Sequence, residues 1–200
     1  NVLPEGVAAF KKGKGNFDLT RLIAGSQGTI GIVSHITMRA LAIPKNTTLI
    51  AIPIFNLEDA AEAITKVLKY DPINVEVFDA LTFNLALSNP DFFKQRLKGG
   101  EYYRVMLSMY TTYHVRYVRK VPEFTVLVTL DEETAAKNPP KDIVRSISNK
   151  GVKPRVVINE YEREMYWQIR RASYTLSKFQ DKTKRPAAFL EDMTVPPENL

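Results

Sequence analysis

A short segment of the chain combines glycine with hydroxyl side chains: Gly25, Ser26, Gly28, Thr29 and Gly31. Because glycine lacks a Cβ, a backbone of this composition can approach a phosphate, a sugar or a flat ring closely. A strand rather than a helix is expected to follow, and the spacing differs from the G-x-G-x-x-G pattern of Rossmann folds. The segment is typical of a nucleotide-binding turn, and the alternative is a tight turn between core strands that binds nothing.

A second set of residues able to bind a ligand lies in a helix predicted from Tyr161 to Leu176. Its members are three or four residues apart and share one face of that helix: Trp167, Arg170, Arg171 and Tyr174. An arginine on this face can hold a carboxylate by two parallel hydrogen bonds. The alternative is a surface ion pair with Glu164 or Glu191 beside a packed Trp167.

A third feature is the tyrosine-rich basic segment, residues 94–120, which has seven Lys and Arg against one acid, Glu101, and so a net charge of +6. Helical spacing predicts an aromatic face made of Tyr103, Met106, Tyr110, Tyr113 and Tyr117. We expect these aromatic side chains to pack on the domain while the basic ones stay in water. The alternatives are docking on an anionic membrane surface or on an electron-accepting partner. Nucleic-acid binding is not expected, because no recognised module accompanies the segment.

Composition limits the class of protein. The chain has 200 residues, of which 44% are hydrophobic and 25% charged, as in globular proteins, and its net charge is +6. No apolar run reaches the roughly 18 to 20 residues that span a bilayer. We therefore expect a cytoplasmic protein, with peripheral attachment to a membrane as the alternative. With no cysteine and only His35 and His114, the sequence does not favour a metal site. The chain starts at Asn1 and ends in a helix-initiating Pro-Pro-Glu, so we expect a fragment.

Hydrophobic periodicity predicts the elements that position these residues. Strands are expected at 32–41, 47–55, 75–78, 124–131, 154–159 and 188–195, and helices after Asn56, at 80–87, at 134–148 with a break near Pro139 and Pro140, and at 161–176. The strand at 32–41 is expected to be buried on both faces. From residue 47 onward the alternation predicts an α+β domain with helices on a largely antiparallel sheet.

The stretch from Asp18 to Val33 closely resembles the end of the FAD-binding domain in FAD-linked oxidases of the vanillyl-alcohol oxidase class. That class includes D-lactate dehydrogenases, the glycolate oxidase FAD subunit, 2-hydroxyglutarate dehydrogenases and alkyl-dihydroxyacetone-phosphate synthases. The resemblance continues, in order and spacing, at residues 55–63, 76–79, 166–170 and 191–196. It therefore covers most of the chain, and the tyrosine-rich basic segment is an insertion relative to the simpler family pattern.

The resemblance implies the end of a PCMH-type FAD-binding domain at residues 1–45, followed by a ferredoxin-like substrate or cap domain at residues 46–200. It implies FAD as the cofactor, lined by six residues with Ile32 near the adenine: Gly25, Ser26, Gly28, Thr29, Gly31 and Ile32. Gln27 stands where the family usually has glutamate. The family's pyrophosphate loop would precede Asn1, and its H-x-G-D-G-N-x-H segment would follow Leu200, so the remainder of the protein is an expected partner.

The implied activity is oxidation of a small 2-hydroxy acid, such as D-lactate or glycolate, or of a related alcohol, by hydride transfer to flavin. The electrons would then pass to an acceptor that the sequence does not identify. Arg170 is expected to bind the substrate, with Tyr174 and Trp167 as walls of its pocket, and no residue is assigned as the catalytic base. The alternatives are a binding or scaffold module without catalysis and a module that docks on a membrane surface.

Overall fold

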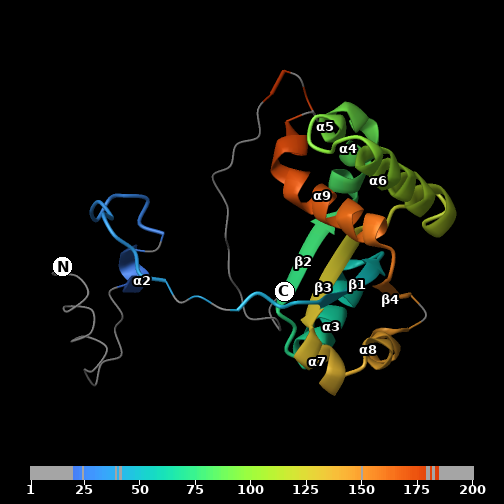
Figure 1. Ribbon diagram of the computed structural model, residues 1–200, viewed down its shortest axis with the longest axis horizontal. Coiled ribbons are helices and arrows are strands. Elements are labelled where there is room, and N and C mark those ends of the chain that lie inside the picture. Colours follow the sequence, from blue (N-terminus) through green and yellow to red (C-terminus); the bar gives the residue numbers. More distant parts are fainter. Residues whose placement is uncertain are drawn as a thin grey trace. The chain divides into compact units, whose positions relative to one another are not determined.

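The computed structural model describes residues 20–23, 25–38, 40, 42–149, 151–178, 181, 183 and 184 (Figure 1). The chain separates into two compact units, residues 1–42 and residues 43–200. The first contains the short helix α2, Thr20–Ile23, followed by an exposed turn. The prediction that residues 1–45 belong to an FAD-binding domain stays a prediction. The tail beyond residue 184, with the strand predicted at 188–195, lies outside the described residues.

The strand predicted at residues 32–41 is wrong for its described part, residues 32–38 and 40. These residues have no regular secondary structure and pair with none of the described strands. The side chains of Ile32, Ile36 and Met38 are exposed instead of buried on two faces. A β-branched segment becomes a strand only where a neighbouring backbone supplies hydrogen-bond partners, and periodicity cannot show whether that neighbour is present.

The second unit is built on a four-stranded sheet in the order β2-β3-β1-β4. The strands are β1 (Thr47–Ile54), β2 (Asn74–Asp79), β3 (Phe124–Asp131) and β4 (Arg155–Val157). Every neighbouring pair is antiparallel, and Val128 of β3 lies opposite Ile50 of β1 and Val75 of β2. Along the chain the unit contains two repeats of strand, helical connection and strand, β1 to β2 and β3 to β4, whose strands alternate in the sheet, which is the ferredoxin-like arrangement. The predicted α+β fold with an antiparallel sheet is therefore confirmed.

Helices cover both faces of this sheet, which makes the unit three layers deep. Helices α3 (Leu57–Leu68) and α8 (Pro140–Ile147) pack on Ile50, Ile52 and Val128, while the opposite face, with Leu49 and Leu127, packs on helices that include α4, α6 and α9. The bounds of α4, α6 and α9 are Ala80–Ser88, Gly100–Thr111 and Glu160–Ser177. Because both faces are covered, consecutive residues of β1 from Leu49 to Ile52 are buried although their side chains point alternately to the two faces.

Helix boundaries follow the side-chain signals in the sequence. The predicted cap is confirmed, since the Asn56 side chain accepts a hydrogen bond of 2.8 Å from the backbone amide of Asp59 at the start of α3. The helix predicted at 134–148 is divided, as expected, into α7 (Glu132–Lys137) and α8, with Pro140 in the first turn of α8. Proline lacks the amide hydrogen that a continuous helix requires, so the break lies where the two prolines stand.

The tyrosine-rich basic segment departs from its predicted face. It contributes the end of α5 (Pro90–Lys94), then α6, and then a π-helical turn η1 (Thr112–Arg116). Tyr113 and Tyr117 pack inward as predicted, but Tyr103 and Tyr110 are exposed, and Val105 and Met109 form the buried stripe of α6. A π turn adds a residue to the helical repeat, so a period of 3.6 residues cannot be carried across residue 112.

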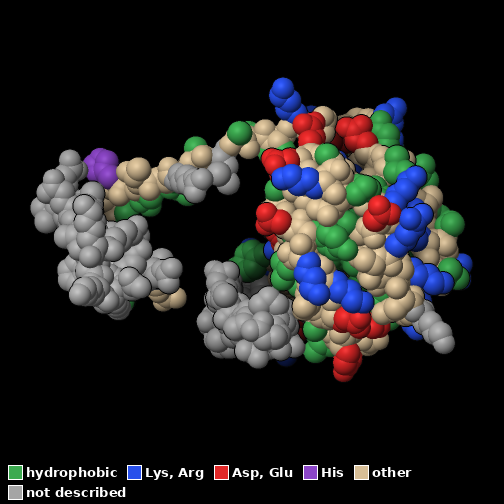
Figure 2. All heavy atoms as spheres, turned by 90° about the horizontal axis from the view of Figure 1, so that it is seen from below, with side chains coloured by type: hydrophobic (Ala, Val, Ile, Leu, Met, Phe, Trp, Pro, Cys, Tyr) green, Lys and Arg blue, Asp and Glu red, His purple; other side chains and the backbone are tan. Residues whose placement is uncertain are grey.

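The described surface of the second unit carries Lys and Arg side chains interspersed with Asp and Glu on the face shown in Figure 2. None of the described helices is both long and apolar enough to cross a membrane.

Candidate functional site

The glycine-rich turn of the first unit follows α2 directly. The amide of Ser26 donates to the carbonyl of Ile23 at 3.1 Å, and the amide of Thr29 donates to the carbonyl of Ser26 at 3.0 Å. Gly25 and Gly28 have φ angles of +85° and +80°, which a residue with a Cβ adopts only with strain. These two glycines are therefore required by the turn itself, whether or not a ligand is bound.

The presence of glycine at position 31 is not explained by backbone conformation, so the space beside it tests whether the turn fits FAD. Its φ lies outside the left-handed region, and a Cβ built there would meet no atom within 4 Å. The space beside Gly25 and Gly28 is equally open. A group from outside can therefore approach this backbone, which fits a nucleotide cofactor, and Ile32 presents an exposed apolar side chain beside it. FAD contact by these residues stays a prediction.

Helix α9 carries the predicted substrate-binding residues. Asn159 caps its start by accepting hydrogen bonds from the amides of Tyr161 and Glu162. Its inner stripe packs under α4 and α6 and against the sheet, with Met165, Ile169 and Leu176 fully buried. The helix is therefore held firmly, and the side chains on its other face have a fixed support.

The outer face of α9 places the candidate residues in different surroundings. Arg170 is half-exposed and donates from Nε to the Glu76 carboxylate on β2 at 2.6 Å, a partner that the sequence did not indicate. Arg171 pairs with Glu164 at 3.4 Å, which is one of the ion pairs considered as an alternative. Tyr174 is exposed, with the Lys178 ammonium 5.1 Å from its ring centre.

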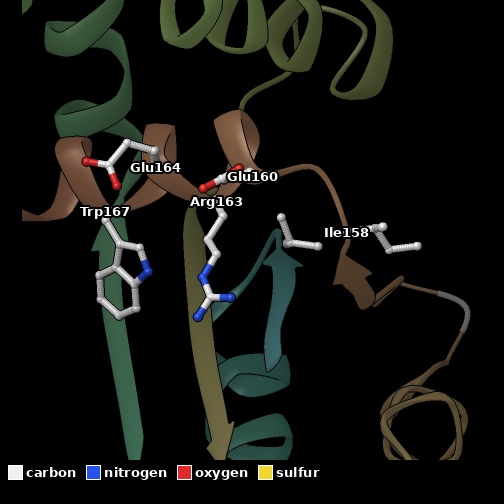
Figure 3. Close-up of a pocket in the computed structure, with 6 residues that line it drawn as sticks. Ile158, Glu160, Arg163, Glu164 and Trp167 are labelled. Carbon is white, nitrogen blue, oxygen red and sulfur yellow. The ribbon is translucent and has the colours of Figure 1, made fainter. Parts of the chain in front are cut away.

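A pocket of about 390 Å³ lies at the start of α9 and along β4, lined by Val157, Ile158, Glu160, Arg163, Glu164 and Trp167. Figure 3 shows the Trp167 ring and the Arg163 side chain extending from the same side of the helix. Arg163 donates to the Thr47 carbonyl at 2.8 Å and to the Thr47 hydroxyl. Of the three predicted substrate-binding residues, only Trp167 lines this pocket. Sequence reasoning missed Arg163, although its position one turn before Trp167 could have indicated it.

The charges that line the pocket do not suit an acid. The lining has two carboxylates, Glu160 and Glu164, and one guanidinium, Arg163, whose hydrogen bonds already hold the start of β1. Glu164 also pairs with Arg171. Because Arg163 is held by Thr47, the lining offers a substrate carboxylate little favourable charge. Arg170 lies outside this lining, and among the described residues its guanidinium is paired with a single carboxylate, Glu76.

A buried polar cluster joins α9, β4 and η1 behind this face. Glu162 accepts two hydrogen bonds from Arg155 and lies 3.3 Å from Arg116 Nε. The Tyr166 hydroxyl accepts a hydrogen bond from Arg155 at 3.0 Å and lies 3.2 Å from the Tyr117 hydroxyl. Burial raises the pKa of Tyr166, and burial, followed by the neighbouring Tyr166, raises the pKa of Tyr117. Both hydroxyls are thus neutral at physiological pH, and the cluster joins the three elements.

This cluster predicts a loss of stability at alkaline pH. A phenol whose pKa is higher in the folded than in the unfolded protein stabilises the fold at pH values below its unfolded pKa, about 10. That contribution is lost as the pH rises through the higher, folded value. We expect the free energy of unfolding to fall above about pH 10, and Tyr117→Phe to reduce this slope while the exposed-site control Tyr103→Phe does not. Urea titrations at several pH values measure the free energy of unfolding of each variant. If it falls with pH equally steeply in Tyr117→Phe and Tyr103→Phe, the prediction is contradicted.

Among the described residues, no group of three or more His, Asp or Glu side chains is placed to hold a metal ion. His114 stacks against Tyr110, with ring centres 4.1 Å apart, and accepts a hydrogen bond from Arg119. His35 lies beside Ser34 on the exposed segment after the glycine turn.

Comparison with known proteins identifies the family. Residues 43–200 match the family described as FAD linked oxidases, C-terminal domain, and the chain belongs to this family. FAD is the cofactor that this assignment indicates, and the predicted resemblance to FAD-linked oxidases is confirmed.

Three known proteins are similar in sequence to part of this chain. A mitochondrial D-lactate dehydrogenase [cytochrome] of Arabidopsis thaliana is 36% identical over 66 residues, which are 30% of this chain and 12% of the relative. A D-lactate dehydrogenase of Anaerostipes hadrus is 34% identical over 68 residues, 32% of this chain and 14% of the relative. A D-2-hydroxyglutarate dehydrogenase of Haemophilus influenzae is 30% identical over 77 residues, which are 38% of this chain and 8% of the relative. The matches thus cover a small part of each relative, and all three names are those of oxidoreductases.

Proposed function

We propose that the chain is part of an FAD-dependent oxidoreductase that oxidises a small 2-hydroxy acid, such as D-lactate or glycolate, or a related alcohol. The observation that carries this proposal is the family match over residues 43–200. The names of the three relatives, two D-lactate dehydrogenases and a D-2-hydroxyglutarate dehydrogenase, support the substrate class. FAD, when bound, supplies the acceptor for the hydride of the substrate carbon, and the electrons pass on to a further acceptor.

The residues of this chain contribute binding and orientation. Gly25, Ser26, Gly28, Thr29, Gly31 and Ile32 are the proposed contacts to FAD. Arg170 is proposed to hold the substrate carboxylate through its Nη atoms, which have no hydrogen-bond partner among the described residues, while Glu76 holds Nε. Trp167 and Tyr174, one turn to either side on α9, are the proposed pocket walls. No described residue is proposed as the catalytic base.

Gly31 provides a test of FAD binding within this chain. Gly31→Ala adds a methyl group where only an external group can be touched, so we expect FAD binding to weaken by about tenfold, or about 1.4 kcal/mol. The matched control is Gly100→Ala, because Gly100 also faces open space, in the first turn of α6. Equilibrium dialysis of the complete protein against FAD measures the change. Equal FAD affinity in the two variants would remove Gly31 from the contact set.

The activity itself is tested on the complete protein that contains this chain. We expect the purified protein to show the visible absorbance of oxidised flavin, and one acid from a panel of D- and L-2-hydroxy acids to bleach it under anaerobic conditions. If flavin is bound but no acid of the panel bleaches it, the substrate belongs to another chemical class than the 2-hydroxy acids. A colourless protein that FAD cannot reconstitute would favour the alternative, a binding or scaffold module. A role at the membrane surface depends on different residues, those of α6 and η1.

A further inference from the structure

The helical excursion between β2 and β3 is larger than the sheet requires. β2 and β3 are antiparallel neighbours, which a short hairpin can join, yet α4, α5, α6 and η1 lie between them, at residues 80–123. Helix α6 packs on α9, and Figure 1 shows it at the outer edge of the unit. One face of α6 is therefore presented to the surroundings.

That outer face is apolar where a solvated helix would be polar. Tyr103, Leu107 and Tyr110 follow one another at intervals of four and three residues, and their exposed fractions are 70%, 61% and 57%. Two further valines lie just beyond the helix, Val115 and Val118, with 75% and 74% exposed. Single exposed apolar residues are ordinary, but a row along one helix face that continues into the next turn indicates a contact surface. We call these five residues the α6 stripe.

The backbone after η1 keeps the Val118 side chain exposed, and it does so in a strained conformation. Val118 and Arg119 have φ angles of +48° and +64°, a conformation that a β-branched residue rarely adopts. The strained turn is fixed from below by the buried Tyr117 hydroxyl against Tyr166, and by the pairing of Arg116 with Glu162. Val118 is therefore held outward by a rigid support.

Within residues 94–120 the charge is almost all of one sign, since Glu101 is the single acid there. Arg104 donates to the Tyr161 hydroxyl on α9, and Arg116 pairs with the buried Glu162. Arg119 and Lys120 are exposed, and their contacts are with the His114 ring and the Phe55 ring and not with an acid of the described residues. An apolar row with tyrosines, bordered by arginine and lysine, matches the layered chemistry of an anionic bilayer surface, with acyl chains below and phosphates above.

We propose that the α6 stripe and its basic border dock the protein on a membrane surface rich in anionic phospholipid. Tyr103, Leu107, Tyr110 and the two valines enter the headgroup region, where tyrosine is favoured because its ring is apolar and its hydroxyl is polar. Arg119 and Lys120 bind lipid phosphates. This attachment lies on the surface of the bilayer, and it is independent of the flavin activity, which can fail or succeed separately.

Vesicle sedimentation of the complete protein tests the docking. Vesicles of equimolar phosphatidylcholine and phosphatidylglycerol are compared with vesicles of phosphatidylcholine alone, at low and at high salt. We expect binding to the anionic vesicles only, weakened by salt. Arg119→Glu with Lys120→Glu, and separately Tyr103→Ser with Tyr110→Ser, should each lower binding by about tenfold or more. All four residues are exposed, so the fold should tolerate the changes.

The matched control is Lys69→Glu with Lys141→Glu, which changes the net charge equally on exposed sites away from α6. We expect this control to bind within about twofold of the unchanged protein, because a charge far from the bilayer acts weakly through salt. Docking is overturned if the protein ignores anionic vesicles at low salt, or if the control loses as much binding as the α6 variants. It is also overturned if the tyrosine variant alters only the oligomeric state, since a second copy would then cover the stripe.

Discussion

Replacing Arg170 by methionine is expected to raise the KM for the proposed 2-hydroxy-acid substrate by about 100-fold, because the proposed two-pronged, charge-assisted pair with its carboxylate is worth about 3 kcal/mol. Methionine keeps much of the length and the apolar part of the side chain, but it provides no hydrogen-bond donor and no charge. Steady-state kinetics of the complete, FAD-loaded protein measure the change. The flavin content should stay unaltered, since Arg170 and the proposed FAD contacts belong to different units of the chain.

Two variants define the specificity of this result. Arg171→Met is the matched control, because Arg171 is the next residue on the same helix and pairs with Glu164. We expect its KM to stay within about twofold, as for most exposed ion pairs. Glu76→Gln should give an intermediate rise in KM with kcat little changed, because glutamine still accepts the hydrogen bond from Arg170 Nε but fixes the guanidinium less firmly. If Arg170→Met and Arg171→Met behave alike, the pair with Glu76 is structural and the acid binds elsewhere.

The second large effect concerns stability. Glu162→Ala is expected to lower the free energy of unfolding by about 3 to 5 kcal/mol, because it leaves a largely buried guanidinium without its counter-charge. The Glu162 side chain is only 7% exposed, and it accepts both hydrogen bonds from Arg155 while also facing Arg116. The loss exceeds that of a surface pair, since water cannot easily reach Arg155 to replace the carboxylate.

Urea denaturation followed by far-ultraviolet circular dichroism measures this loss. Glu133→Ala is the control, because its exposed pair with Lys137 lies one turn apart on α7 and should contribute at most about 0.5 kcal/mol. Glu162→Gln should fall between the two, since it keeps an acceptor for Arg155 but loses the charge. A Glu162→Ala protein as stable as the control would mean that Arg155 reorients into solvent, and that the cluster does not hold α9 to β4.

Much of the fold was predictable because its signals are local. The cap at Asn56 and the break at Pro139 and Pro140 depend on neighbours within one helical turn, and both are confirmed. The apolar, β-branched stretch at residues 47–55 predicted a strand, and β1 (Thr47–Ile54) confirms it. The same reasoning was wrong at residues 32–38, because a strand depends on a partner that its own sequence does not specify.

The candidate site was only partly predictable. The pattern at Trp167, Arg170 and Tyr174 indicated one helix face, yet the pocket is lined by Trp167 and by neither Arg170 nor Tyr174. The partner of Arg170 is 94 residues away in the sequence, and that of Arg163 is 116 residues away. The sequence pattern identified Arg170 as a candidate but did not pair it, since any of the chain's acids could be the partner, and it did not indicate Arg163, whose partner is the Thr47 backbone and hydroxyl.

The sequence by itself determined the family, the antiparallel α+β unit and the glycine turn, because motifs, caps and periodicity act over a few residues. The tertiary structure decided which arginine meets a carboxylate and which side of α6 stays exposed. The sheet places Glu76 on β2 beneath α9, and the π turn η1 shifts the helical phase so that Tyr117 is buried while Tyr103 and Tyr110 face outward. The Arg170–Glu76 pair, and the contacts that hold Tyr117 and Arg116 against α9, join elements far apart in the chain, and their geometry is set only when the layers pack together.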